Sequence, residues 1–142
     1  MTVDEMLEKL KTDSIIQGES ILGDLEGQTL VDSVFVDVDF QNVSFAGSCF
    51  ERVVFQKCKM SSLDFQQSSF SSCSFIKCDV QSSDFSGITL LLSTFIETNL
   101  YGGVFSDTTI FRGLFSNCVL DLAIFDKSDI SMTTFVQSSC NQ

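Results

Sequence analysis

Two kinds of side chain in this sequence could do chemistry, and in both kinds the possible partners stand 20 residues apart. Asp64 and Asp84 could form a carboxylate pair or a metal site, and Asp121 and Asn141 share that spacing. The alternative is that these are solvated surface acids, the usual state of charged side chains, and we favour it. Because the chain contains no His, imidazole acid–base catalysis and Ser–His or Cys–His nucleophiles are excluded.

The cysteines are the second kind. Cys58 and Cys78 could hold a metal together or form a redox disulfide. No Cys-x-x-Cys or zinc-type spacing occurs, however, and a buried free Cys is commonly a small apolar residue. We therefore expect structural free thiols, no metal or cofactor, and no enzymatic activity. The six cysteines are Cys49, Cys58, Cys73, Cys78, Cys118 and Cys140.

A five-residue period underlies these spacings and must position the side chains. Every fifth residue from Phe35 to Phe135 is apolar, which gives 21 consecutive units without an insertion. The period matches neither a helix nor a plain strand and is typical of an internal repeat. We call the fifth residue the centre of its unit. The centres are Phe at fourteen units and Met60, Val80, Leu90, Leu100, Ile110, Leu120 and Ile130 at the others.

Small residues recur two positions before each centre, with Leu63 and Ile88 as the large exceptions. A small inward residue beside a large one suits a narrow, filled tube. This pattern over roughly residues 31–140 resembles the pentapeptide repeat family, whose motif is Ala-(Asp/Asn)-Leu-X-X or the same with Phe at the centre. Only Ala123 keeps the Ala of that motif. The units that match best are Val38-Asp39-Phe40, Leu63-Asp64-Phe65, Cys78-Asp79-Val80, Ser83-Asp84-Phe85, Thr98-Asn99-Leu100 and Ser128-Asp129-Ile130.

The resemblance implies an all-β fold, a right-handed parallel β-helix of square cross-section with four units per coil. Four units per coil predict a 20-residue period. The column from Phe35 to Phe135 and the column from Phe45 to Phe125 contain only Phe, whereas the two columns between them mix Phe with aliphatic residues. Stacked identical side chains form ladders at the spacing of neighbouring strands. The 21 units predict about five coils.

The two ends of the coil differ in sequence. Residues 2–12 predict a short amphipathic capping α-helix, with Thr2 and Glu5 placed for a capping box. Residues 13–30 predict an irregular first coil, in which Ile15 still falls on a multiple of five. We therefore divide the chain into an N-terminal cap at 1–30 and a repeat β-helix at 31–140. No lid follows the last coil, and we expect a homodimer formed end to end through Phe125, Ile130 and Phe135.

Charge and hydropathy limit the partners. The net charge is −11, which disfavours direct nucleic-acid binding because that requires a basic face. No apolar run approaches the ~20 residues of a membrane span, so we expect no membrane association. The acidic start of the chain lacks the features of a signal peptide, and we expect a cytoplasmic protein with reduced thiols.

Outward positions should be polar, yet several near the C-terminal end are apolar. A 20-residue coil stacks Leu91 on Phe111 and aligns Leu92, Arg112 and Met132 in the next column. Local packing between neighbouring side chains is one explanation. We favour a protein interface, because contiguous exposed apolar surface usually marks a partner. The candidate interface comprises Leu91, Leu92, Phe111, Arg112, Leu114, Met132, Tyr101 and Leu122.

We weigh two functions. The first is a non-enzymatic scaffold that mediates protein–protein interaction. The second comes from the family resemblance: some members mimic B-DNA and bind DNA gyrase. DNA carries one charge per ~1.7 Å, so a coil of roughly 25 Å would need about 15 charges. Residues 31–142 carry twelve acids and six bases, a net of −6. The sequence therefore favours the scaffold.

Overall fold

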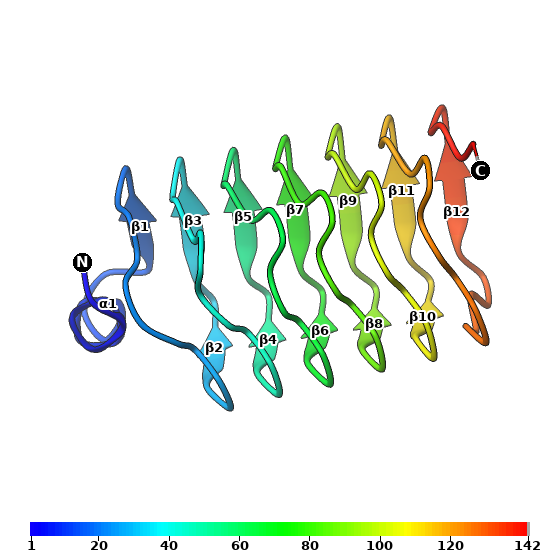
Figure 1. Ribbon diagram of the computed structural model, residues 1–142. Coiled ribbons are helices and arrows are strands. Elements are labelled where there is room, and N and C mark those ends of the chain that lie inside the picture. The colour runs from blue at the N-terminus through cyan, green and yellow to red at the C-terminus, as the bar shows by residue number, and fades with distance from the viewer. Residues whose placement is uncertain (142) are drawn as a thin grey trace.

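The computed structural model of the chain describes residues 1–141, whose backbone winds into a parallel β-solenoid behind one short helix, α1 (Val3–Leu10) (Figure 1). One sheet has seven strands, in the order β1 (Ile15–Gln17), β3 (Val34–Val36), β5 (Val54–Gln56), β7 (Ser74–Ile76), β9 (Thr94–Ile96), β11 (Leu114–Ser116) and β12 (Thr134–Val136). The other has five, in the order β10 (Thr109–Phe111), β8 (Thr89–Leu91), β6 (Ser69–Ser71), β4 (Cys49–Glu51) and β2 (Thr29–Val31).

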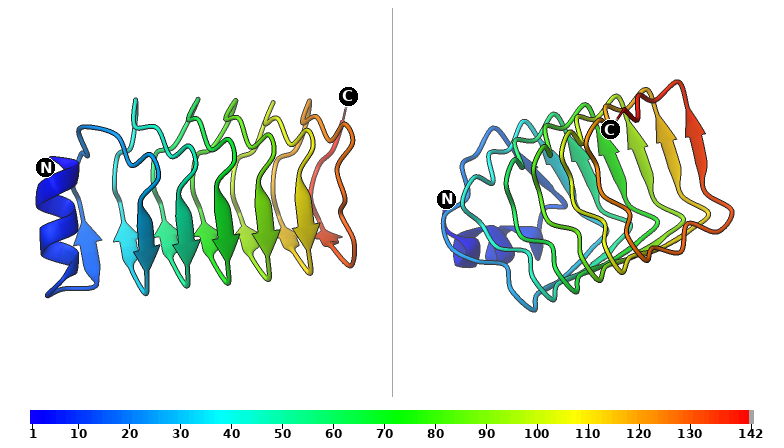
Figure 2. Two further views of the ribbon diagram at one scale, coloured as in Figure 1. Left: turned by 90° about the horizontal axis from the view of Figure 1, so that it is seen from below. Right: turned by 45° about the vertical axis from the view of Figure 1, so that its right-hand side comes forward.

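Each turn of the solenoid has four sides, and the turns stack along one axis (Figure 2). The chain crosses the seven-stranded side, then a second and a third side, and then the five-stranded side. The second and third sides are joined between turns by single parallel bridges such as Asp39↔Lys59 and Asp64↔Asp84.

The register confirms the 20-residue turn. Phe55 pairs with Phe75, and Phe75 with Phe95, along the seven-stranded side. Ring centroids in this column lie between 4.6 and 5.3 Å apart, and the Phe75 and Phe95 rings are within 2° of parallel. Rings of the third side meet this column edge-on, as Phe85 does with Phe95 at 6.4 Å. The predicted Phe ladders therefore form the core.

The corners share one backbone conformation. Every residue two positions after a centre, from Asp32 to Gln137, has a φ between +47° and +69°. This left-handed region suits Gly, Asn and Asp and penalises β-branched residues most. No corner residue in this range is β-branched. The left-handed conformation of the corner therefore restricts which residues can stand two positions after a centre. The apolar period of the centres does not reveal this restriction.

The N-terminal end confirms the helix and corrects the first coil. Thr2 and Glu5 form the predicted capping box, and Met6 is fully buried against the first coil. β1 extends the seven-stranded sheet into that coil, but with a register that differs from the later coils. The expectation for Ile15 is wrong: Ile16 pairs with Phe35 and is buried, whereas Ile15 is 45% exposed. The inward register slips by one residue here, and the solenoid has about six turns rather than five.

Candidate interaction surface

Three large apolar residues occupy corners of the last turns. Leu92, Leu122 and Met132 have φ values of 51°, 59° and 55°. They are also 54%, 50% and 66% exposed. A left-handed conformation costs a residue other than Gly roughly 1–2 kcal/mol, and exposed apolar atoms gain little from burial. Folding alone does not account for these three choices.

The first apolar group lies along the corner between the five-stranded and seven-stranded sides. Leu91 and Phe111 are Cα partners in β8 and β10, and each is 38% exposed. The guanidinium carbon of Arg112 lies 5.3 Å from the centroid of the Phe111 ring, within the range of a cation–π contact. The predicted stacking is therefore present, and the cation rests on the aromatic ring. The group comprises Leu91, Leu92, Phe111, Arg112, Leu114 and Met132.

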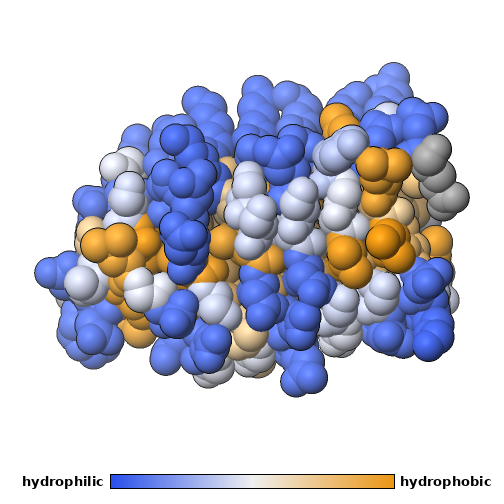
Figure 3. Space-filling model, viewed as in Figure 1, coloured by the Kyte–Doolittle hydropathy of each residue, from blue (hydrophilic) through white to orange (hydrophobic). Residues whose placement is uncertain are grey.

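The second apolar group lies on the second and third sides, which follow the seven-stranded side along the chain. Tyr101 is 42% exposed, and Leu122 is close to the bridged pairs Asn99↔Val119 and Val104↔Ile124. On the side that Figure 3 shows, apolar side chains lie towards both ends of the solenoid, and one group is near the C-terminal end. The eight predicted residues thus divide into two groups, and a partner that touched both would wrap around the seven-stranded side. The group comprises Tyr101, Val119, Leu122 and Ile124.

The predicted dimer residues lie at the C-terminal end of the core. Phe125 is partly buried, while Ile130 and Phe135 are 43% and 41% exposed. Together with Ser138 and Cys140 they line a cavity of about 340 Å³. Phe125 and Phe135 each stack on the ring one turn below, at 4.8 and 4.9 Å between centroids. This end therefore presents the last rings of the two Phe ladders as an apolar surface.

The stacked acids accept hydrogen bonds from backbone N–H groups of the turns that follow them. The Asp64 carboxylate accepts the backbone N–H of Gln66 at 2.8 Å, and Asp84 accepts that of Ser86 at 2.9 Å. Partial burial would raise the pKa of Asp84, but hydrogen bonds from Ser86 and Gln66 outweigh that effect, and the pKa lies below its ordinary value. Hydrogen bonds from Ser139 and Asn141 likewise lower the pKa of Asp121. Ionised acids bound to turn amides have a structural role.

The buried cysteines also have a structural role. The Cys78 thiol donates to the Phe55 carbonyl at 3.3 Å, and the Cys58 thiol donates to the Phe35 carbonyl at 3.5 Å. A hydrogen bond with Cys78 and burial both raise the pKa of the Cys58 thiol. The raised pKa disfavours the reactive thiolate of Cys58, whereas the same hydrogen bond lowers the pKa of Cys78. Cys49 and Cys140 are the two exposed cysteines.

Hydrogen bonding at the small inward position was not predicted from the sequence. The Ser83 hydroxyl donates to the Met60 carbonyl at 2.9 Å, and Thr98 donates to the Phe75 carbonyl at 3.1 Å. Each bond joins the small residue of one unit to the centre of an earlier turn, 23 residues before it. The signal in the sequence was that Ser, Thr and Cys, which can donate a hydrogen bond, recur at this position in place of Ala. These bonds tie successive turns together inside the tube.

Two further structural features are absent from residues 1–141. Within this part of the chain, no group of three or more acids and cysteines is placed to hold a metal ion. Among the same residues, no helix has the length and apolar character required to cross a bilayer.

The family model for pentapeptide repeats matches the chain in eight copies, at residues 24–56 and 48–87. No curated protein has a sequence significantly similar to this one.

Solved structures of pentapeptide repeat proteins are similar to this chain at low sequence identity. A trypsin-treated form of QnrB1, a plasmid-mediated fluoroquinolone resistance protein, is 14% identical, with a TM-score of 0.56 over 90% of this chain and 83% of that one. The pentapeptide repeat protein Rfr23 from the cyanobacterium Cyanothece 51142 is 9% identical, with a TM-score of 0.47 over 97% of this chain and 99% of that one. At these identities the likeness to QnrB1 shows the fold alone.

Proposed function

Since the chain belongs to the pentapeptide repeat family, we propose that it is a rigid, non-enzymatic scaffold that binds another protein through the two apolar groups near its C-terminal end. The observation that carries this proposal is the placement of Leu92, Leu122 and Met132 in a disfavoured backbone conformation while their side chains face solvent. Binding of a partner would bury these apolar side chains and so offset the cost of their backbone conformation.

The first apolar group has the make-up of a binding centre. Phe111 presents an aromatic face with the Arg112 cation over it, flanked by the aliphatic side chains of Leu91 and Leu92. Aromatic residues and Arg dominate the energetics of protein interfaces, and apolar neighbours exclude water around them. The chemistry of the remaining side chains supports a scaffold, because the stacked acids bind turn amides and burial raises the pKa of the Cys73 and Cys118 thiols.

The test compares two matched variants in affinity purification from cells that produce the protein. Phe111→Ser removes the centre of the first group, and Leu22→Ser removes a side chain that is 65% exposed at the other end. We expect the wild type and the Leu22→Ser control to retain the same partner, and Phe111→Ser to bind it at least about 30-fold more weakly. Circular dichroism must show that both variants are folded. Equal retention by the two variants would contradict the proposal.

A homodimer is the second element of the proposal, because the last centres are apolar and exposed. The cavity beside Phe125, Ile130 and Phe135 can accept side chains of a second copy. We expect light scattering to give twice the chain mass at micromolar concentration and Phe135→Asp to give the single mass. A wild-type protein that remains monomeric throughout this range would contradict the dimer.

DNA mimicry that targets gyrase is the competing function, and the fold shared with QnrB1 is the reason to test it. A mimic needs continuous rows of negative charge. Here the corner column after the seven-stranded side mixes signs, with Asp37, Lys57, Lys77 and Glu97 in successive turns. A supercoiling assay with purified gyrase separates the functions: the scaffold proposal predicts no inhibition by this protein, and inhibition would favour mimicry.

A further inference from the structure

The two sheets end at different levels at the N-terminal end of the solenoid. The seven-stranded sheet begins with β1, whereas the five-stranded sheet begins one turn later with β2, which pairs only with β4. On the five-stranded side, α1 lies where the preceding turn would be (Figure 1). β2 is therefore the edge strand of the five-stranded sheet at the N-terminal end of the solenoid.

The free edge of β2 presents backbone donors. The ladder towards β4 uses the carbonyl of Gln28, which accepts from Cys49 at 2.8 Å, and the N–H of Asp32, which donates to Glu51 at 3.0 Å. Successive peptide groups of a strand point to opposite sides. The N–H groups of Thr29 and Val31 therefore point away from β4, and they have no hydrogen-bond acceptor among residues 1–141.

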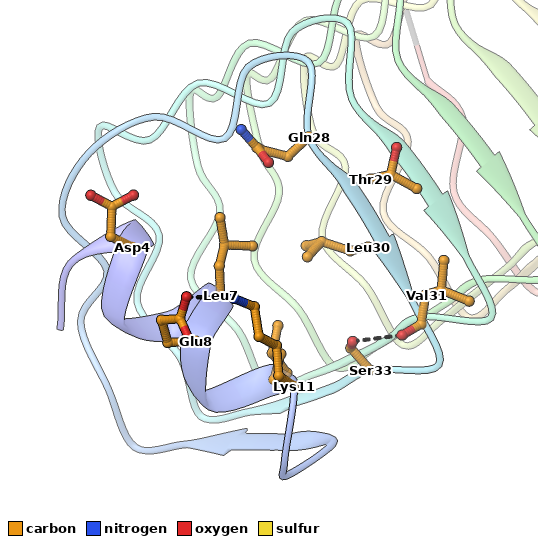
Figure 4. A pocket seen from close by; sticks show the side chains of 10 residues that line it. Asp4, Leu7, Glu8, Lys11, Gln28, Thr29, Leu30, Val31 and Ser33 are labelled. Carbon is orange, nitrogen blue, oxygen red and sulfur yellow. Dashed lines mark hydrogen bonds and ion pairs between the residues drawn. The ribbon is translucent and has the colours of Figure 1, made fainter.

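A groove of about 540 Å³ lies along this edge, between α1 and β2. Leu7 on α1 and Leu30 on β2 face each other across it, while Thr29 and Val31 point elsewhere, as alternation along a strand requires (Figure 4). Leu7 is half-buried and Leu30 is 4% exposed. The volume lies in the range of ligand-binding clefts. The groove thus combines an apolar floor with an unpaired strand edge.

The charge around the groove is negative. Asp4 and Glu8 line it from α1, and its cation, Lys11, is bound to Glu8 at 2.5 Å. Residues 1–30 together carry seven acids and two lysines, a net charge of −5. A cationic segment is therefore favoured over an acidic one, and the same charge disfavours a nucleic acid.

We propose that this groove binds an extended, basic segment of a partner protein, which adds beside β2 as a sixth strand of the five-stranded sheet. The segment places one apolar side chain between Leu7 and Leu30, and its carbonyls accept the N–H groups of Thr29 and Val31. Strand addition at an open edge is a general mode of peptide recognition. A folded β-coil does not fit, because α1 covers the rest of this end. This inference is independent of the C-terminal apolar groups.

The test uses amide hydrogen exchange with the peptide Gly-Lys-Val-Leu-Val-Arg-Gly as the probe. We expect the amides of Thr29 and Val31 to exchange rapidly in the free protein and to become at least about 10-fold slower with peptide, half-saturated on the order of 100 μM. The same peptide with Glu in place of Lys and Arg is the charge control and should bind at least about 10-fold more weakly.

Two substitutions at one position isolate the backbone contribution. Val31→Pro removes the N–H that faces the groove and leaves the bonds to β4 in place, as Pro does on edge strands. Val31→Thr keeps that N–H. We expect peptide protection of the Thr29 amide to be lost in Val31→Pro and retained within about twofold in Val31→Thr. Absence of protection in the wild type at about 1 mM peptide, or equal protection in the two variants, overturns the inference.

Discussion

The stacked Phe rings make a measurable contribution to stability that a double-mutant cycle can isolate. Phe85 is fully buried and stacks on Phe65 and Phe105 at 4.6 and 4.7 Å, and it meets Phe95 edge-on at 6.4 Å. Each aromatic pair contributes about 0.5–1.5 kcal/mol beyond area burial. Because Phe85→Leu keeps most of the apolar volume and loses all three pairs, we expect it to lower the free energy of unfolding by about 2–4 kcal/mol.

The cycle combines Phe85→Leu with Phe105→Leu and measures unfolding in urea by circular dichroism. We expect a coupling energy of about 0.5–1.5 kcal/mol between the two stacked rings. Phe50 and Phe85 share no ring partner, so Phe50→Leu with Phe85→Leu is the control pair and should be additive within about 0.3–0.5 kcal/mol. A coupling of the stacked pair no larger than that of the control would refute the view that stacking, rather than burial alone, favours Phe in this column.

Three further predictions concern the inward and turn positions, each measured by thermal or urea unfolding. Cys118→Ser should change the free energy of unfolding by less than about 1 kcal/mol because Ser also donates to the carbonyl below, whereas Cys118→Val should lose about 0.5–1.5 kcal/mol; equal losses would remove the hydrogen-bond explanation. Gly113→Ala places a Cβ 2.7 Å from Cγ2 of Ile110 and should cost about 1–3 kcal/mol, so an unchanged stability would show that Ile110 moves freely. Because the pKa of folded Asp84 is lowered, its ionised form stabilises the fold above its ordinary pKa, and this contribution is lost as the pH falls through the lowered value. Asp84→Asn should therefore melt below the wild type near pH 7, the difference should shrink as the pH falls through the lowered pKa of Asp84, and a constant difference would contradict the assignment.

The repeat was predictable because it is a strict period of large apolar residues. One large inward side chain per five residues determines which positions face the core, and the 20-residue columns specify the stacking. The helix was also predictable, since Thr2 and Glu5 have the spacing of a capping box. The exposed apolar residues could be identified once inward and outward positions were known, but their division into two groups required the path of the chain around the seven-stranded side.

The slip at the start of the coil could not be read from the period. Ile15 and Ile16 are equally apolar, and only the pairing of Ile16 with Phe35 decides between them. The groove depends on this start, because one sheet begins a turn before the other. The left-handed corners leave a weaker trace, the absence of β-branched residues, since many polar residue types tolerate that conformation.

The single Tyr of this Trp-free chain gives the protein a built-in optical reporter. Tyr101 belongs to the second apolar group and is 42% exposed, so excitation beyond the absorption of Phe reports on that surface and leaves the core silent. A ligand that covers Tyr101 changes its emission and its quenching by iodide without any label. Binding to the second apolar group can therefore be titrated on the unmodified protein. Binding at the distant α1–β2 groove leaves the Tyr101 emission unaltered.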